Sequence, residues 1–331
     1  MTSDGPLELE LSTARYDRIW PLVDGRVEPE GIRLRYVPSS INELFIRQLS
    51  DKPFDVSEMS LSNMITRTSR RIAGLVALPI VTSRAFRHSG ILVRSDSGID
   101  KPADLVGRRV GVRDYTMTAA LFIRGMLEHQ YGVQPAQIDW YWGGLNQASN
   151  DQLRVVFAPP PGLSLTWIGP NRSLAEMILH DELDALVLAE PPRIWLEGTP
   201  KLQRLFPAYR AESIQYFRET GIVPIMHLVV VREEHYRSHP WIARSLFDAF
   251  LASRDVCLAE LADFGALRAT LLFLEAELEE ERQILGDDFW PYGLAANRTT
   301  LEAAIQFAVE QGLSDRPFDP EELFVPELRG N

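Results

Sequence analysis

Strand-like and helix-like segments alternate along this chain, and this alternation constrains the fold more than any other feature. Residues 7–11 alternate leucine and glutamate with period two, and the apolar runs 183–188 and 225–231 are typical of buried strands. Residues 118–131 have a helical pattern that is followed by Gly132, a residue type that favours helix ends. Such alternation predicts an α/β fold with largely parallel sheets, because each helix packs on a sheet while returning the chain for the next strand.

The length of the chain allows two domains, since 331 residues can bury more than one full core. The sequence has no internal repeat and no low-complexity linker. We therefore expect two lobes joined by strands rather than two domains on a flexible tether.

Charge and composition exclude several partners. The net charge of −12 argues against nucleic acid, since no basic stripe is present to neutralise phosphates. The single cysteine, Cys257, excludes an internal disulfide, and no set of histidines and cysteines has the spacing of a zinc site. The N-terminal residues lack the basic and apolar regions of a signal peptide, and no apolar run approaches membrane-spanning length. We therefore expect a cytoplasmic protein that does not act at a membrane.

A basic cluster between two apolar segments is the first candidate site. Residues 83–89 contain Arg84, Arg87 and His88. Arginine offers a planar fork of donors to a carboxylate, and histidine exchanges a proton near neutral pH. The cluster is either an anion site or a solvated basic turn, and the sequence pattern alone supports both interpretations equally.

Four blocks of sequence resemble the 4,5-dihydroxyphthalate decarboxylase family in order and spacing. They are residues 54–62, 83–89, 224–227 and 286–293, the last followed by Asn297-Arg298. The likeness runs from about residue 7 to residue 324. It implies a two-lobed α/β fold similar to the type II periplasmic binding proteins, with a hinge crossed twice and a ligand cleft between the lobes.

The resemblance also implies a division of the chain. The first lobe would hold residues 1–95 and 226–331, and the second would hold residues 96–225. Ligands in open α/β sheets bind beyond the carboxyl ends of the strands. The loops that follow strands are therefore the candidates for ligand contacts: residues 14–17, 58–62, 83–88, 114–118 and 190–193.

Tyr115, Thr116 and Thr118 precede the predicted helix 118–131. Their hydroxyl groups could simply cap this helix, but a helix N-terminus also attracts an anion, and we favour binding.

Glu58 lies beside Ser60 and Ser62 directly after a strand, where it could bind a ligand hydroxyl or form an ordinary ion pair. His227 interrupts the apolar run 225–231. It is either a core histidine satisfied by a carbonyl group or a cleft residue at the second hinge crossing.

Glu190 and Arg193 flank Pro191-Pro192, whose stiffness suits a preorganised site as well as any tight turn. Trp290 and Tyr292 either stack on an aromatic ligand or pack in the core. The adjacent Asp287-Asp288 has no third ligand that would fix a metal, so we expect none.

The resemblance implies decarboxylation of 4,5-dihydroxyphthalate, or a related hydroxylated aromatic dicarboxylate, to protocatechuate and carbon dioxide. This reaction needs an acid for the ring carbon, an acceptor for a ring hydroxyl and cations for carboxylates. We expect Arg84, Arg87 and Arg193 to bind carboxylates. His88 would protonate the carbon and His227 would contact a ring hydroxyl, and these two roles are interchangeable. Glu58 or Glu190 would take the hydroxyl proton or orient a histidine. The scheme needs no cofactor, and no glycine-rich phosphate motif is present.

Two other functions are compatible with a two-lobed α/β fold of this kind. A solute-binding protein of a transporter shares the implied fold, but it would need a signal peptide or an N-terminal lipobox cysteine. A ligand-sensing domain of a transcription regulator would need an attached helix-turn-helix. The sequence leaves the exact substrate and homo-oligomer formation undecided.

Overall fold

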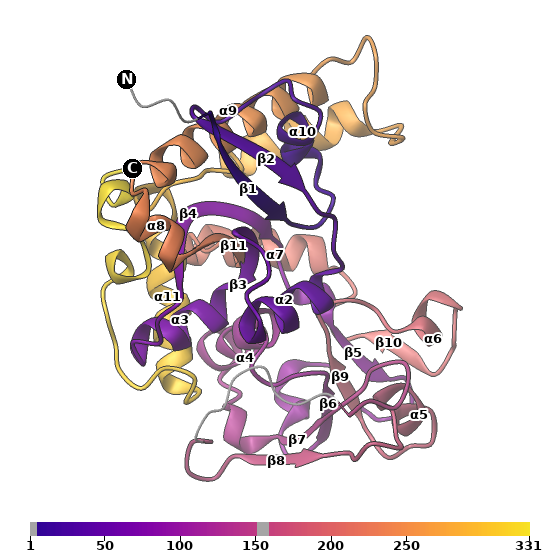
Figure 1. Ribbon diagram of the computed structural model, residues 1–331. Helices are drawn as coiled ribbons and strands as arrows, with labels where there is room; N and C mark the ends of the chain where they lie inside the picture. The colour runs from indigo at the N-terminus through magenta and orange to yellow at the C-terminus, as the bar shows by residue number, and fades with distance from the viewer. Residues whose placement is uncertain (1–4, 151–158) are drawn as a thin grey trace.

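The computed structural model describes residues 5–150 and 159–331, and it confirms the α/β class because helices cover two β-sheets (Figure 1). The first sheet has the order β2-β1-β3-β11-β4, with β1 at Leu7–Ser12, β2 at Ile32–Tyr36, β3 at Val56–Ser60, β4 at Leu75–Arg84 and β11 at Ile225–Arg232. The second has the order β10-β5-β9-β6-β7-β8, with β5 at Ile91–Arg94, β6 at Arg109–Val112, β7 at Asp139–Trp142, β8 at Ser164–Trp167, β9 at Ala185–Val187 and β10 at Leu202–Arg204.

Both sheets are mixed, so the expectation of largely parallel sheets is wrong at two strands. β1 pairs in parallel with β2 and β3, and β6 pairs in parallel with β7 and β9. In contrast, β11 is antiparallel to β3 and β4, and β5 is antiparallel to β9 and β10. Each of these two strands directly follows a crossing between the sheets. After each crossing, the chain therefore enters the next sheet at the edge where the parallel strands of that sheet end.

The chain crosses between the sheets twice. β4 ends at Arg84 in the first sheet and β5 begins at Ile91 in the second, so the first crossing lies within residues 85–90. The boundary expected near residue 95 would have placed β5 in the first lobe, whereas β5 pairs with strands of the second sheet. The return crossing leads from α7 (Tyr209–Thr220) to β11.

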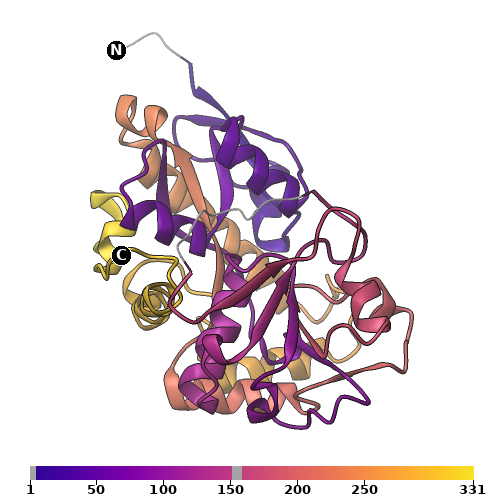
Figure 2. The ribbon, with the colours of Figure 1, turned by 90° about the horizontal axis from the view of Figure 1, so that it is seen from below.

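The helices pack around the sheets and between them. They are α1 (Trp20–Val23), α2 (Ile41–Ser50), α3 (Leu61–Ser69), α4 (Thr118–Tyr131), α5 (Leu174–Leu179), α6 (Arg193–Leu196), α8 (Glu233–Ser238), α9 (Ile242–Leu261), α10 (Leu274–Leu285) and α11 (Arg298–Glu310), besides α7. α4 ends as its sequence predicts, because Gly132 adopts a left-handed φ of 70°. The orange α9 packs beside the indigo N-terminal segment at α1, and the yellow α11 lies beside α3 and α4 (Figure 1, Figure 2).

One hydrophobic core extends through both lobes. It includes Val229 of the first sheet, Val112 of the second sheet and Phe122 of α4, and α4 also packs against α3 and α11. Because packed interiors deform little, this continuous core holds the facing edges of the two sheets in a fixed relation. Across the described residues, no helix has both the length and the apolar character needed to span a membrane.

Candidate active site

A cavity of about 200 Å³ lies between the lobes, at the edge where the parallel strands end. β3 ends at this cavity, the residues that follow β6 and β9 line it, and β11 begins beside it. The lining residues are Ile41, Asn42, Phe45, Ser60, Arg87, Arg113, Met117, Thr118, Ala119, Leu145, Leu188, Ala189, Glu190, Met226 and His227. Both sheets contribute, so the cavity is the interlobe cleft that the sequence analysis expected.

His227 and Glu58 form a hydrogen-bonded pair at the cleft wall. The pair arises because β11 and β3 are adjacent antiparallel strands, on which His227 lies opposite Ser60. The His227 Nδ1 donates to Glu58 Oε1 at 2.6 Å, and the imidazole ring contacts the ring of Phe45 edge-on. Because Nδ1 is engaged, Nε2 is the nitrogen that remains for a ligand in the cleft.

Glu58 is completely buried, yet it is surrounded by donors. The Tyr16 hydroxyl donates to Oε1 at 2.6 Å, the Thr82 hydroxyl donates to Oε1 at 3.2 Å, and the Ala14 N–H donates to Oε2 at 3.1 Å. Burial alone would raise the pKa of Glu58, but the charge of His227 and these hydrogen bonds lower the pKa below its ordinary value. Glu58 is therefore a buried carboxylate that accepts a hydrogen bond from His227 and orients its imidazole ring.

Two hydroxyl groups from different lobes meet in the cleft. The hydroxyls of Ser60 and Thr118 are 2.8 Å apart, and both residues line the cavity. Ser62 lies behind them, where its hydroxyl donates to the carbonyl of Thr116 at 2.7 Å and its N–H donates to Thr118 Oγ1 at 3.0 Å. Ser60 and Thr118 can therefore contact a ligand, whereas Ser62 and Thr116 join α3 to the start of α4.

Arg87 reaches the cleft from the first crossing. Its Nε donates to the Met226 sulfur at 3.1 Å, and its Nη1 donates to the Ala189 carbonyl at 3.1 Å. Burial lowers the pKa of Arg87 to about 10, which leaves it cationic at neutral pH. The Met226 sulfur and the Ala189 carbonyl are both uncharged, so this guanidinium brings a positive charge to the cleft in a fixed orientation.

Arg113 is a cleft residue that the sequence analysis missed. It directly follows β6, and its Nη1 lies 3.3 Å from Glu190 Oε1. A cation directly after a predicted strand is a signal similar to the basic cluster in residues 83–89, but the predicted candidate loop began one residue after Arg113, at Asp114.

His88 does not face the cleft, and this overturns its expected role as the acid. It is 1% exposed, its ring packs edge-on against Phe206 and Tyr216, and its Nδ1 lies 3.0 Å from the Ser213 hydroxyl. Burial lowers the pKa of His88 from 6.5 to about 4. His88 is therefore a neutral core histidine that packs beneath α7.

Replacement of His88 by glutamine should change stability and its pH dependence but leave turnover within about twofold. The unfolded chain protonates this histidine below pH 6.5 and the folded chain only below about 4. Between pH 6.5 and about 4 the unfolded state therefore binds more protons than the folded state. The free energy of unfolding of the wild type is therefore highest above this pH range and falls by up to about 3 kcal/mol as the pH drops through it. Urea unfolding of both proteins at pH 4.5 and 7 checks this, and an equal pH dependence would contradict it.

Arg84 and the aromatic residues near residue 290 also lie outside the cleft. Arg84 Nη2 donates to the Asn297 side-chain oxygen at 2.7 Å and to the Pro291 carbonyl at 3.0 Å. The Trp290 Nε1 donates to a β4 carbonyl, and Tyr292 is 7% exposed. The last sequence block therefore packs the C-terminal segment against β4, and neither Trp290 nor Tyr292 lines the interlobe cavity.

Tyr115 and Arg193 are likewise not part of the cavity lining. Tyr115 is fully buried, and the guanidinium of Arg124 lies 3.6 Å from the centre of its ring. Arg193 is exposed at the start of α6, where its backbone N–H donates to the Asn146 side chain at 2.7 Å. Neither residue is placed to bind a ligand in this cleft.

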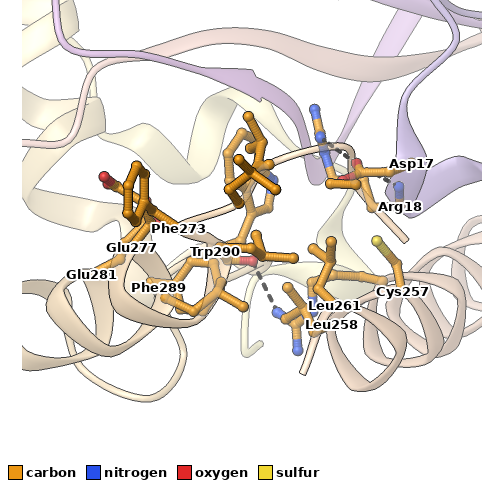
Figure 3. Close-up of a pocket in the computed structure, with 16 residues that line it drawn as sticks. Asp17, Arg18, Cys257, Leu258, Leu261, Phe273, Glu277, Glu281, Phe289 and Trp290 are labelled. Carbon is orange, nitrogen blue, oxygen red and sulfur yellow. Dashed lines mark hydrogen bonds and ion pairs between the residues drawn. The ribbon is translucent and has the colours of Figure 1, made fainter. Parts of the chain in front are cut away.

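Trp290 instead lines a second, larger pocket of about 540 Å³ beside α9 and α10 (Figure 3). Its wall is mainly apolar, as Leu258, Leu261 and Phe273 show. Arg18 lies over the Trp290 ring and already pairs with Asp17 at 3.0 Å. The combination of a histidine with two arginines occurs in the smaller cleft, which is therefore the better candidate for chemistry.

A group of side chains that lie close enough together to bind a metal ion is found away from the cleft. Within residues 5–150 and 159–331, such a group is formed by Glu128, His129 and Glu310, but His129 Nε2 already pairs with Glu310 at 2.8 Å. Asp288, considered above as a metal ligand, pairs with Arg254 at 3.2 Å. Neither arrangement contributes to the interlobe cavity.

Solved structures define the class to which this fold and cleft belong. The periplasmic aliphatic sulphonate binding protein SsuA from Escherichia coli aligns over 99% of this chain and 100% of its own, with a TM-score of 0.55 and 13% identity. A desulfurization enzyme, DSZB, aligns over 97% of this chain and 98% of its own, with a TM-score of 0.50 and 16% identity. A model of the NMT1/THI5 like family matches residues 30–151. The chain thus has the two-lobed periplasmic-binding-protein-like fold.

Similarity in sequence is more specific than the fold. A 4,5-dihydroxyphthalate decarboxylase of Comamonas testosteroni is 34% identical over 320 residues, which cover 97% of both chains. A protein of the same name from Pseudomonas putida is 31% identical over 212 residues, which cover 64% of this chain and 82% of the relative. The chain belongs to the 4,5-dihydroxyphthalate decarboxylase family, as the four sequence blocks predicted.

Proposed function

We propose that the protein decarboxylates 4,5-dihydroxyphthalate to protocatechuate and carbon dioxide in the interlobe cleft. The observation that carries this proposal is the imidazole of His227, paired with a buried carboxylate, in one cavity with Arg87 and Arg113. Proton transfer and carboxylate binding are what this reaction requires. Family membership supports the choice of reaction and substrate.

The reaction replaces a carboxylate by a proton. The ring hydroxyl para to one carboxylate donates electron density, so the carbon that bears this carboxylate can accept a proton. The bond to the carboxylate then breaks, its electron pair returns to the ring, and carbon dioxide leaves. The net change consumes one proton, so a proton donor at the ring carbon is the group that the protein must supply.

His227 is the proton donor in this proposal. The Glu58 carboxylate accepts from Nδ1 and orients the ring, so Nε2 is the nitrogen from which a proton would be transferred in the cleft. After transfer, the neutral imidazole takes a proton from water. Ser60 and Thr118 offer hydroxyl groups near His227, and they are suited to hydrogen bonding with the two adjacent ring hydroxyls.

The charge distribution in the cleft favours departure of one carboxylate over the other. A cation that binds the departing carboxylate tightly would stabilise the substrate more than the transition state, because this charge disappears as carbon dioxide forms. Arg87 therefore binds the carboxylate that stays. The departing carboxylate would then lie toward Arg113, in a part of the same cavity that is also lined by apolar side chains such as Leu145 and Leu188.

Purified protein incubated with 4,5-dihydroxyphthalate tests this function. We expect carbon dioxide and protocatechuate in equal amounts, and no carbon dioxide from phthalate, which lacks the para hydroxyl. Tight binding of the dihydroxy compound without product would instead favour a solute-binding protein, the alternative that the shared fold supports. A cytoplasmic location also remains a proposal, and fractionation of cells that express the complete gene would test it.

Substitution of Arg87 by lysine should weaken binding of phthalate about tenfold. Lysine keeps the charge but loses the planar fork, and a hydrogen bond to a charged group contributes about 1.5–3 kcal/mol. Arg84→Lys is the matched control, because Arg84 bonds only to protein groups near residue 291 in the contacts described. Calorimetry should show unchanged affinity for Arg84→Lys. Equal weakening in both variants would contradict the assignment of Arg87.

A further inference from the structure

We infer that Glu190 competes with the second substrate carboxylate for Arg113, because Glu190 and Arg113 form an ion pair in the cleft. The Arg113–Glu190 ion pair lies in the cavity lining, with an N–O distance of 3.3 Å. The Glu190 side chain is 60% exposed and that of Arg113 is 27% exposed. An exposed pair of this kind is weak enough for a ligand carboxylate to replace it. The inference rests on the proposed function in taking an aromatic dicarboxylate as the ligand.

One loop contacts both cations. Arg87 donates to the carbonyl of Ala189, and Arg113 pairs with the side chain of the next residue, Glu190. The loop is stiffened directly afterwards by Pro191-Pro192. The two guanidinium groups thus contact two consecutive residues, Ala189 and Glu190, and such an arrangement suits two carboxylates on adjacent ring carbons.

The competition discriminates between dianions and monoanions. A monocarboxylate can bind Arg87 and leave the Arg113–Glu190 pair intact. A dicarboxylate that uses both cations must displace Glu190, so its second carboxylate is held only weakly. This weakly held group is the one that leaves, and Arg113 then pairs with Glu190 again. Glu190 thereby limits ground-state stabilisation of the departing group and favours release of the monocarboxylate product.

Binding of phthalate and benzoate tests this inference without any turnover. Calorimetry should show that Glu190→Gln binds phthalate about two- to fivefold more tightly, with little change for benzoate. Arg113→Gln should weaken phthalate binding about tenfold and reduce the preference for phthalate over benzoate. The double variant should resemble Arg113→Gln, because Glu190 acts only through Arg113.

A surface ion pair of similar geometry provides the matched control. Glu302 lies 3.5 Å from Arg298 on α11 and has a 55% exposed side chain, and Glu302→Gln should not change either affinity. Unchanged or weaker phthalate binding by Glu190→Gln overturns the inference, as do additive effects in the double variant. Loss of turnover in Glu190→Gln without tighter binding would also overturn it and would assign Glu190 to proton transfer. If the wild type releases no carbon dioxide but these affinities follow the pattern, the proposed function fails and the inference stands.

Discussion

Substitution of His227 by glutamine should lower kcat by about 10²–10⁴-fold, because general acid catalysis contributes a factor of this size. Glutamine can still donate a hydrogen bond to Glu58, but it has no proton to transfer to a ring carbon. The affinity for phthalate should stay within about threefold of wild type, since the carboxylate contacts of Arg87 remain. Steady-state kinetics with 4,5-dihydroxyphthalate and calorimetry with phthalate measure the two effects separately.

The matched control for this variant is His88→Gln, which alters a histidine in the core. We expect it to keep wild-type turnover because His88 contacts Ser213 and two aromatic rings rather than the cleft. If His227→Gln retains kcat, His227 is not the acid, and Glu190 becomes the candidate among the titratable residues that line the cavity.

Replacement of Glu58 by glutamine should lower kcat about 10–100-fold with little effect on KM. The Nδ1–H of His227 would exchange its carboxylate acceptor for a neutral amide, and a hydrogen bond to a charged group is worth about 1.5–3 kcal/mol. Tyr16→Phe is the matched control, because it removes a neutral partner of the same carboxylate oxygen and leaves the charge. Its effect on kcat should be smaller, and a larger effect than that of Glu58→Gln would contradict our account of the pair.

The same substitution should change stability in acid. Because the folded pKa of Glu58 is lowered, its ionised form stabilises the fold above the pKa of an unfolded glutamate, about 4.3. This stabilisation is lost as the pH falls through the lower folded value. Glu58→Gln lacks this component, so its free energy of unfolding should depend less on pH below about 5.

Much of the fold could be predicted from the sequence because it depends on local patterns. The alternation of apolar runs with helical segments identifies the class, and Gly132 ends α4 as expected. The antiparallel insertion of β11 between β3 and β4 could not be predicted in this way. The apolar run 225–231 shows that a strand is buried, but it does not show which strands pair with it or in which direction.

The candidate site was predicted only in part, for a related reason. Arg84, Arg87 and His88 are neighbours in sequence, yet only Arg87 reaches the cleft. Arg84 ends a strand and turns toward Asn297, and His88 packs into the core. Position along a crossing segment does not determine the direction of each side chain, and the partners that attract Arg84 and His88 lie more than 100 residues away in the sequence.

The central claim, that the interlobe cleft is the active site, is tested most directly by a crystal structure of His227→Gln with 4,5-dihydroxyphthalate. This variant should bind the substrate without consuming it. We predict that the ring lies in the cleft, with one carboxylate on Arg87, the other near Arg113, and the carbon that bears the latter facing residue 227. A ligand bound in the pocket beside Trp290, with the cleft empty, would contradict the account.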